Sequence, residues 1–248
     1  MAKHKIAGYL AAILIAVPLA LSGSAFGRLP VKEKSPAADQ VKKVEDAIRV
    51  LEEMMKESDK SIPVGLIEDC AGLAIIPDVI KAGLFIGGRH GKGVLLVRTK
   101  GGWTNPSFID IKGGSVGWQA GVESADVILV FRTPRSIENI TDGKFTLGAD
   151  AGVAAGPLGR SAEASTDTAL KAEILAYSRS RGLYAGLTLQ GSSLQEDRKA
   201  NRNFYGMESV SPKDIFEGKV TAVPEVAVKL KNALAELVKN SRGTALGH

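Results

Sequence analysis

One short segment of the sequence has the spacing of a hydrolase nucleophile. Residues 113–117 are Gly-Gly-Ser-Val-Gly, which matches the G-x-S-x-G pattern around a catalytic serine. That pattern requires a sharp turn from a strand into a helix, whereas the apolar residues here continue toward another predicted strand. A general base is also scarce, because only His90 and His248 remain once a predicted leader containing His4 is removed. We therefore expect that the chain is not an enzyme.

Few residues of the sequence are suited to metal binding or redox chemistry. Cys70 is the only cysteine, so the chain cannot form an intramolecular disulfide. It follows an apolar helical pattern, which favours a small buried side chain over a redox or nucleophilic role. One cysteine and two distant histidines do not supply a metal site, and Gly91-Lys92-Gly93 lacks the rest of a phosphate-binding loop. We expect no metal and no cofactor.

Basic residues concentrate between positions 81 and 112. Six Lys or Arg residues stand there against one acid, Asp110. His90-Gly91-Lys92-Gly93 predicts a hairpin turn, because glycines can take the positive φ of such turns. The hairpin would gather Lys81, Lys100 and Trp103 at one end and Arg89 and Lys92 at the other. Each end would contact anions, and Trp103 would lie at a membrane interface. The alternative is a solvated surface with Trp103 in the core.

Two further arginines lie on a predicted strand. Arg179 and Arg181 are two residues apart, so their side chains share a face. They would bind a phosphate or pair with carboxylates such as Asp150 or Glu173, and we favour the pairing. The candidate lipid-binding residues are therefore Lys81, Arg89, Lys92, Lys100, Trp103, Arg179 and Arg181.

Residues 1–27 predict a cleavable secretory leader. A basic front is followed by a short apolar run and by small residues, with cleavage expected after Ala25 or Gly27. The alternative is an uncleaved anchor. Residues 28–40 predict a tether, and residues 41–240 a single domain. Loss of Lys3 and Lys5 lowers the net charge from +5 to +3, which is too small to predict nucleic-acid binding.

The periodicity of apolar residues predicts an α+β fold. Spacings of three and four predict helices over 41–56, 62–72, 133–140, 194–205 and 223–239, the fourth ended by Gly206. Strands are expected near 73–76, 83–89, 93–99, 107–117, 126–132, 144–154, 171–179 and 182–190. Glycines recur every fourth residue at 113–121 and 148–156, which would place each set on one face of a strand. Such faces let a sheet curve strongly, so we expect a barrel-like antiparallel sheet with N- and C-terminal helices packed against it.

Six motifs in the same order and spacing resemble the SYLF domain family. They lie at 70–77, 103–109, 114–121, 148–150 with 155–160, 177–183 and 203–206, and their order and spacing match the family from about residue 61 to residue 206. The resemblance implies a non-catalytic lipid-binding module. Eukaryotic members bind phosphoinositides and in some cases actin, whereas bacterial members are often exported, stand-alone proteins.

A predicted leader and the resemblance together suggest where the chain would act. We expect a bacterial protein in the periplasm or outside the cell, associated peripherally with anionic phospholipids of the envelope. For an exported protein we do not expect actin as a partner. The alternative is a structural envelope protein whose glycine faces mediate protein docking or self-association into a homo-oligomer.

Overall fold

The computed structural model describes residues 35–245, with gaps at 57–60, 142, 144, 160–170, 181–182 and 185–188. Residues 84–86, 115–121, 183–184 and 240–245 are described by their backbone alone. The predicted leader and most of the predicted tether therefore lie outside the described residues. The described residues belong to a unit that spans Lys34–His248. Its first helix begins at Ala38, inside the predicted tether.

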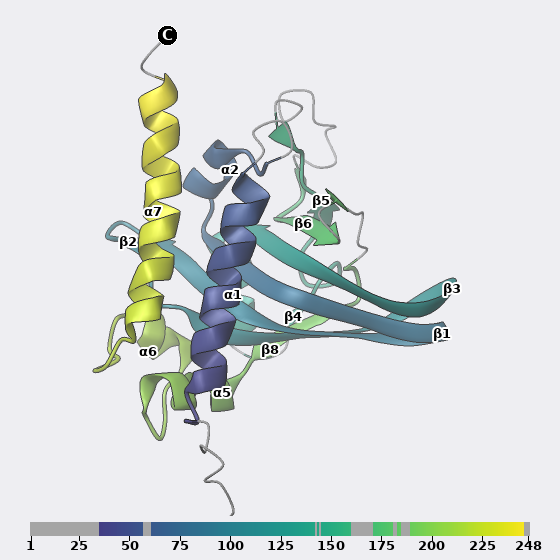
Figure 1. Ribbon diagram of the computed structural model, residues 1–248, viewed down its shortest axis with the longest axis horizontal. Helices are drawn as coiled ribbons and strands as arrows, with labels where there is room; N and C mark the ends of the chain where they lie inside the picture. The colour runs from purple at the N-terminus through teal and green to yellow at the C-terminus, as the bar shows by residue number, and fades with distance from the viewer. Residues whose placement is uncertain are drawn as a thin grey trace, which may run out of the picture. The chain divides into compact units, whose positions relative to one another are not determined.

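The described strands form one eight-stranded sheet (Figure 1). All paired strands are antiparallel except β5 and β6, which are parallel. The strands are β1 (Gly72–Thr99), β2 (Gly102–Trp103), β3 (Ser107–Phe131), β4 (Phe145–Thr146), β5 (Val153–Ala155), β6 (Ile174–Ser180), β7 (Leu183–Tyr184) and β8 (Ser193–Glu196).

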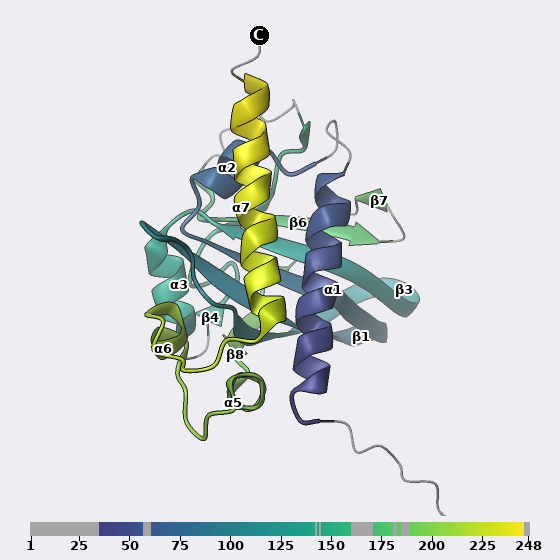
Figure 2. The same ribbon diagram turned by 60° about the vertical axis from the view of Figure 1, so that its left-hand side comes forward.

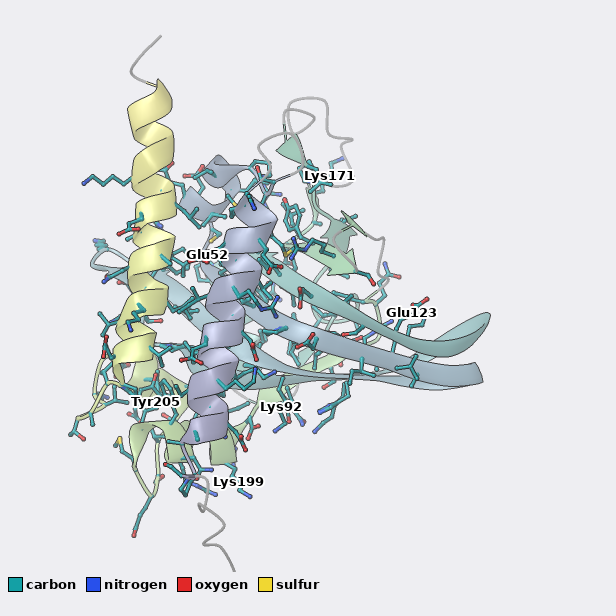
Figure 3. All side chains as sticks on the ribbon, viewed as in Figure 1. Glu52, Lys92, Glu123, Lys171, Lys199 and Tyr205 are labelled. Carbon is teal, nitrogen blue, oxygen red and sulfur yellow. The ribbon has the colours of Figure 1, made fainter. Side chains whose placement is uncertain are left out.

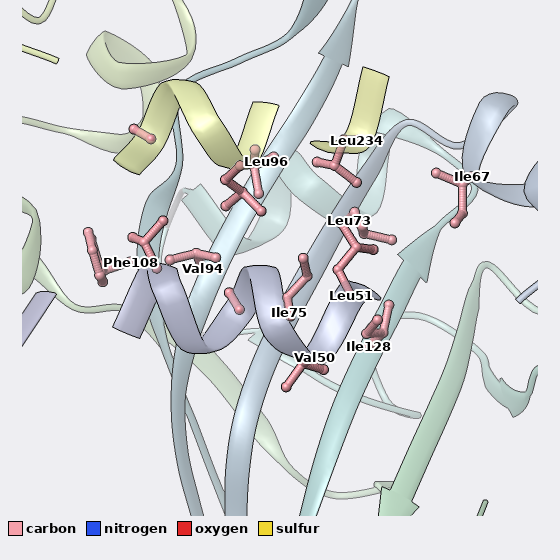
Figure 4. Close-up of a cluster of buried hydrophobic side chains, with 14 of the residues drawn as sticks. Val50, Leu51, Ile67, Leu73, Ile75, Val94, Leu96, Phe108, Ile128 and Leu234 are labelled. Atoms are coloured by element: carbon pink, nitrogen blue, oxygen red, sulfur yellow. The ribbon is translucent and has the colours of Figure 1, made fainter. Parts of the chain in front are cut away.

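Strand β1 turns back on itself. A straight strand of its 28 residues would be about 90 Å long, yet the Arg98 N–H at its end donates to the carbonyl of Ala71 just before its start, at 2.8 Å. Its two halves consequently lie side by side, with Val94 and Leu96 next to Ile75 and Leu73 in Figure 4. β3 pairs with β1 from Leu95↔Ser107 to Gly72↔Phe131, so it reverses with β1. We call this doubled-back pair the β1/β3 ribbon.

The predicted turn at residues 90–93 is wrong. These residues lie inside a paired strand, where His90 faces Lys112 and Lys92 faces Asp110. Gly91 and Gly93 do not form a turn, and neither has a positive φ. Their lack of a side chain instead allows neighbouring parts of the chain to approach closely. A Cβ on Gly93 would lie 2.3 Å from the carbonyl oxygen of Ile75 in the other half of β1. Glycine thus marks where two backbones nearly touch, a role that a single sequence does not distinguish from a turn.

One face of the sheet is covered by two long helices. α1 (Ala38–Met55) and α7 (Glu225–Ala245) contact each other and lie against the strands (Figure 2). The apolar stripes predicted for them are buried against the sheet, as Leu51 and Leu234 show in Figure 4. The short helices α2 (Val64–Glu68) and α6 (Pro212–Phe216) add Ile67 and Ile215 to the same buried cluster.

The opposite face carries a second buried cluster. α3 (Pro134–Thr141) places Ile137 and Ile140 on this face, against residues of the central strands such as Leu129. β8 closes the cluster with Leu194, which has no exposed surface. Both faces of the central strands are therefore apolar, and alternate residues serve opposite cores.

The structure corrects two predicted elements in the second half of the chain. The helix expected over 194–205 begins only at Arg198, because residues 193–196 pair as β8 and Asp197 caps α5 (Arg198–Tyr205). Gly206 ends that helix with φ 64°, as predicted. The strand expected over 144–154 is split into β4 and β5 by a turn in which Gly148 has φ 86°. Its glycines therefore do not share one strand face, whereas the predicted fold class is confirmed.

Candidate functional site

A cluster of alternating charges surrounds Lys92. Its Nζ lies 2.5 Å from Asp197 Oδ2 and 3.7 Å from Asp110 Oδ1. Lys112 Nζ contacts the other oxygen of Asp110 at 3.2 Å. The hydrogen bond to Asp197 raises the pKa of Lys92, although burial opposes the shift. Burial acts to raise the pKa of Asp197, but Lys92 and the Ala200 N–H outweigh it and leave the pKa below its usual range. Lys92 is thus neutralised by carboxylates.

Arg89 is buried inside the sheet. Its side chain keeps 6% of its surface, and Nη1 donates to Ser192 Oγ at 2.7 Å. Its Nε has no hydrogen-bond partner. Burial lowers the pKa of this guanidinium below its usual value.

Lys81 lies far from the residues with which sequence analysis grouped it. It faces Glu123 across the β1/β3 ribbon, with Lys81 Nζ 3.8 Å from Glu123 Oε2. Lys100 lies in the turn just after Arg98, at the opposite end of β1. The Arg98 N–H donates to the carbonyl of Ala71, so that end of β1 lies beside Ala71, and the ten residues from Ala71 to Lys81 extend over about 30 Å of strand. The predicted grouping of Lys81 with Lys100 and Trp103 is therefore wrong, because it assumed the turn at 90–93.

Trp103 belongs to the interior on the helical side. The half-buried indole packs against the cluster beneath α1 and α7. The Arg98 guanidinium lies 5.5 Å from the centroid of its ring. This position matches the alternative of a core tryptophan, while Lys100 beside it is exposed.

Arg179 connects the sheet to α1. It forms an ion pair with Glu53, donates through Nη1 to the Glu53 carbonyl at 3.3 Å and lies 4.0 Å from Asp126 Oδ2. Its partners are thus Glu53 and Asp126 instead of Asp150 or Glu173. Glu173 accepts hydrogen bonds from the hydroxyls of Thr133 and Ser136. Arg181 lies outside the described residues.

Sequence reasoning missed an apolar patch on the β1/β3 ribbon. Ile80 is 47% exposed and Val122 is 72% exposed, the highest value among the exposed large hydrophobic side chains of the described residues. Val122 faces Ala82, so these three residues share a face of the ribbon. We call Ile80, Ala82 and Val122 the ribbon-end patch. The signal was present in the alternation of apolar and polar residues around Lys81 and Glu123, but burial by a helix was the simpler expectation.

The ribbon-end patch lies away from the helices. Figure 1 shows β1 and β3 extending beyond α1 and α7, and Glu123 marks this end in Figure 3. Lys92 lies closer to α1 in the same view (Figure 3). The patch is therefore open to a partner that neither long helix would obstruct.

The described residues show little that favours catalysis. Cys70 lines a pocket of about 350 Å³ with Arg132 and Glu173, but burial raises the pKa of its thiol to about 12. A thiol with that pKa stays protonated at neutral pH and is a poor nucleophile. Ser115 lies within β3, so its segment makes no strand-to-helix turn. Within the described ranges, no group of three His, Cys, Asp or Glu side chains could hold a metal ion.

None of the described helices is both long enough and apolar enough to cross a bilayer.

The fold and its surfaces define a class of protein, an α+β domain built on a strongly curved sheet. Residues 112–237, half of the chain, match the family model described as "Ysc84: Las17-binding protein actin regulator". The chain belongs to this family, which confirms the resemblance to the SYLF domain.

Curated relatives carry the same region within longer chains. Protein YSC84 of Saccharomyces cerevisiae is 40% identical over 187 residues, which is 72% of this chain and 40% of the relative. LAS seventeen-binding protein 3 of the same yeast is 39% identical over 173 residues, 68% of this chain and 37% of the relative. The human SH3 domain-containing YSC84-like protein 1 is 37% identical over 183 residues, which is 72% of this chain and 53% of the relative. The match thus spans about half or less of these relatives, and one of them, LAS seventeen-binding protein 3, is named for binding another protein.

Proposed function

We propose that this chain is a non-catalytic module that docks on anionic phospholipid surfaces through the ribbon-end patch. The observation that carries the proposal is the exposure of Ile80 and Val122 on one face of a protruding ribbon. Burying a valine or isoleucine side chain in an apolar phase contributes about 1.5–3 kcal/mol, so two partly exposed side chains supply a useful share of peripheral membrane binding.

Lys81, which follows Ile80 and lies on the opposite face of the same ribbon end, adds the preference for anionic lipid. Its ion pair with Glu123 is long, and the two side chains are 32% and 56% exposed. Such a pair is worth at most about 1 kcal/mol, so the ammonium group is available to a lipid phosphate. A cation near an anionic surface contributes about 1 kcal/mol to membrane binding, which offsets the free energy lost when the ion pair with Glu123 breaks.

The amphipathic helices are weaker candidates for the membrane contact. The apolar stripes of α1 and α7 lie in the buried cluster on the sheet. Insertion into a bilayer would require each helix to leave the sheet and expose that cluster. The ribbon-end patch needs no such rearrangement. With the predicted leader, the proposed place of action is the periplasmic or extracellular face of an anionic membrane.

Vesicle co-sedimentation tests the proposal. Replacing Ile80 and Val122 with Ser should weaken binding to anionic vesicles of phosphatidylglycerol and phosphatidylcholine by about tenfold or more. Val228→Ser is the matched control, because Val228 is 40% exposed on α7. It should bind as the parent does. Equal binding by the double variant and the parent, or no pelleting of the parent with anionic vesicles, would refute the proposal.

A second candidate is protein docking, which the family description favours. That description names Las17 binding and actin regulation, and the expectation that actin is not a partner finds no support in the comparisons. Co-sedimentation of the chain with actin filaments tests this function without lipid. Pelleting that rises with filament concentration would support it, and a chain that stays in the supernatant would exclude actin binding.

A further inference from the structure

One row across the sheet contains Arg89, Gly113 and Ser192. Arg89 of β1 faces Gly113 of β3, and a Cβ on Gly113 would lie 2.7 Å from Ser192 Oγ. Because Gly113 has no side chain, the guanidinium crosses it and reaches that hydroxyl at 2.7 Å. The row therefore holds an arginine flat against the sheet, next to a serine that directly precedes β8.

This arginine has no acidic partner among the described residues. Its Nη1 donates to Ser192, and Nε is buried without a hydrogen bond. A guanidinium has five N–H donors, and here the buried Nε–H has no acceptor. Removing a charge from water costs several kcal/mol unless an opposite charge compensates it.

The nearby carboxylates lie on the other side of the sheet. Asp110 faces Lys92 across the strands, and Lys92 is three residues from Arg89, so the two basic side chains point to opposite faces. Asp197 is likewise engaged by Lys92. Arg89 instead follows the face of Gly91, whose Cβ position meets Val79 and Ile111. The counter-charge of Arg89 must therefore come from outside the described protein.

We propose that Arg89 and Ser192 bind a phosphate group. With Nη1 occupied by Ser192, the guanidinium retains its Nε and Nη2 edge, which fits two oxygens of an oxyanion. Ser192 accepts from Arg89, so its own hydroxyl proton remains to donate to a third oxygen. A tetrahedral phosphate presents three such oxygens, whereas a planar carboxylate has two. Gly191, next to Ser192, has nothing within 4 Å of its Cβ position, which leaves room for the ligand.

The phosphate could be inorganic phosphate or the headgroup of a lipid. The site goes beyond the proposed membrane docking, because Arg89 and the ribbon-end patch lie on opposite faces of the sheet. Val79 is buried in the cluster on the same face as Arg89. Ile80 is the next residue along the strand, so its side chain points to the opposite face.

Thermal unfolding of the full chain with inorganic phosphate tests the site. Phosphate should raise the Tm of the parent more than chloride at equal ionic strength, because it binds the folded state. In Arg89→Met this difference should vanish, and its Tm without phosphate should equal or exceed the parent's, since a buried charge is removed. Lys100→Ala, which removes an exposed cation, should keep the response of the parent.

Ser192→Ala keeps the arginine and serves if Arg89→Met does not fold. It should weaken phosphate binding about tenfold, measured by calorimetric titration. An equal phosphate response in the parent and Arg89→Met would overturn the proposal. So would a parent whose Tm does not distinguish phosphate from chloride.

Vesicles separate the two sources of phosphate. If a lipid headgroup is the ligand, Arg89→Met should weaken binding to phosphatidic acid vesicles and leave binding to phosphatidylglycerol unchanged. If free phosphate is the ligand, both affinities should match the parent's. A phosphate response that depends on Arg89 in a protein that binds no vesicles would support this site and refute the membrane proposal alone.

Discussion

The basic side chains of the sheet differ in what neutralises them. Lys92 is held by two carboxylates, and Arg179 is paired with Glu53, while Arg89 is buried with a hydroxyl only. Lys100 is exposed in a turn. A count of charges along the sequence treats these residues alike. Their contributions to binding and stability differ because their partners differ.

Removal of Arg179 should destabilise the protein. Its side chain is 15% exposed and joins α1 to β6 through Glu53. Arg179→Ala should lower the free energy of unfolding in urea by about 1–3 kcal/mol, between the values of exposed and buried pairs. Arg49 also contacts Glu53, at 3.4 Å, but is 44% exposed. Arg49→Ala should therefore cost less than about 0.5 kcal/mol. Similar losses for the two variants would contradict the structural role of Arg179.

The Lys92–Asp197 pair should make stability depend on pH in acid. The pKa of Asp197 is lower in the folded chain than in the unfolded chain. Its carboxylate therefore stabilises the fold above the unfolded pKa, and this contribution disappears as the pH falls through the folded pKa. Asp197→Asn retains a side chain able to cap α5 but removes the charge.

Urea unfolding at several pH values measures this effect. The parent should exceed Asp197→Asn by about 1 kcal/mol at pH 7. The difference should shrink toward zero as the pH falls through the folded pKa of Asp197, which lies below its usual range, because both side chains are then uncharged. A difference that stays constant across this range would assign it to the helix cap instead of the ion pair.

At the scale of elements, glycine determines how closely β1 doubles back. A Cβ on Gly93 would meet backbone atoms of Ile75 and Ile76 at 2.3 and 2.8 Å, which have no freedom to move aside. Gly93→Ala should therefore cost about 2–3 kcal/mol in the free energy of unfolding. Gly88→Ala is the matched control on the same strand, because nothing lies within 4 Å of its Cβ position. It should leave stability unchanged or slightly raised. A tolerated Gly93→Ala would refute the close contact between the halves of β1.

Local periodicity explains which elements could be predicted. Helices α1 and α7 and the curved sheet could be predicted from the spacing of apolar residues, because this spacing is present within each segment of the sequence. The position of the reversal in β1 could not be predicted, because glycines in a turn and at a close approach look the same in sequence. Arg179 and Glu53 are 126 residues apart, so their contact exists only after the sheet has formed. The ribbon-end patch was missed for the same reason, since exposure depends on where α1 ends.

The whole molecule determines which cations approach a membrane together. Sequence analysis placed Lys81 and Lys100 together at one end of a hairpin, where both would contact anions. In the structure Lys100 follows Arg98, which lies beside Ala71, whereas Lys81 is ten residues further along β1 from Ala71, about 30 Å away. The Debye length at physiological salt is about 8 Å, so a cation 30 Å from an anionic surface is screened from it.

An orientation that inserts the ribbon-end patch therefore separates the two lysines in function. Lys81→Ala should weaken binding to anionic vesicles about fivefold at physiological salt, with little effect on neutral vesicles. Lys100→Ala should bind as the parent does, and the double variant should match Lys81→Ala. Co-sedimentation over a range of salt concentrations measures all three. Weakened binding by Lys100→Ala alone would mean that the opposite end of β1 faces the membrane, with the exposed turn after Arg98 at the lipid surface.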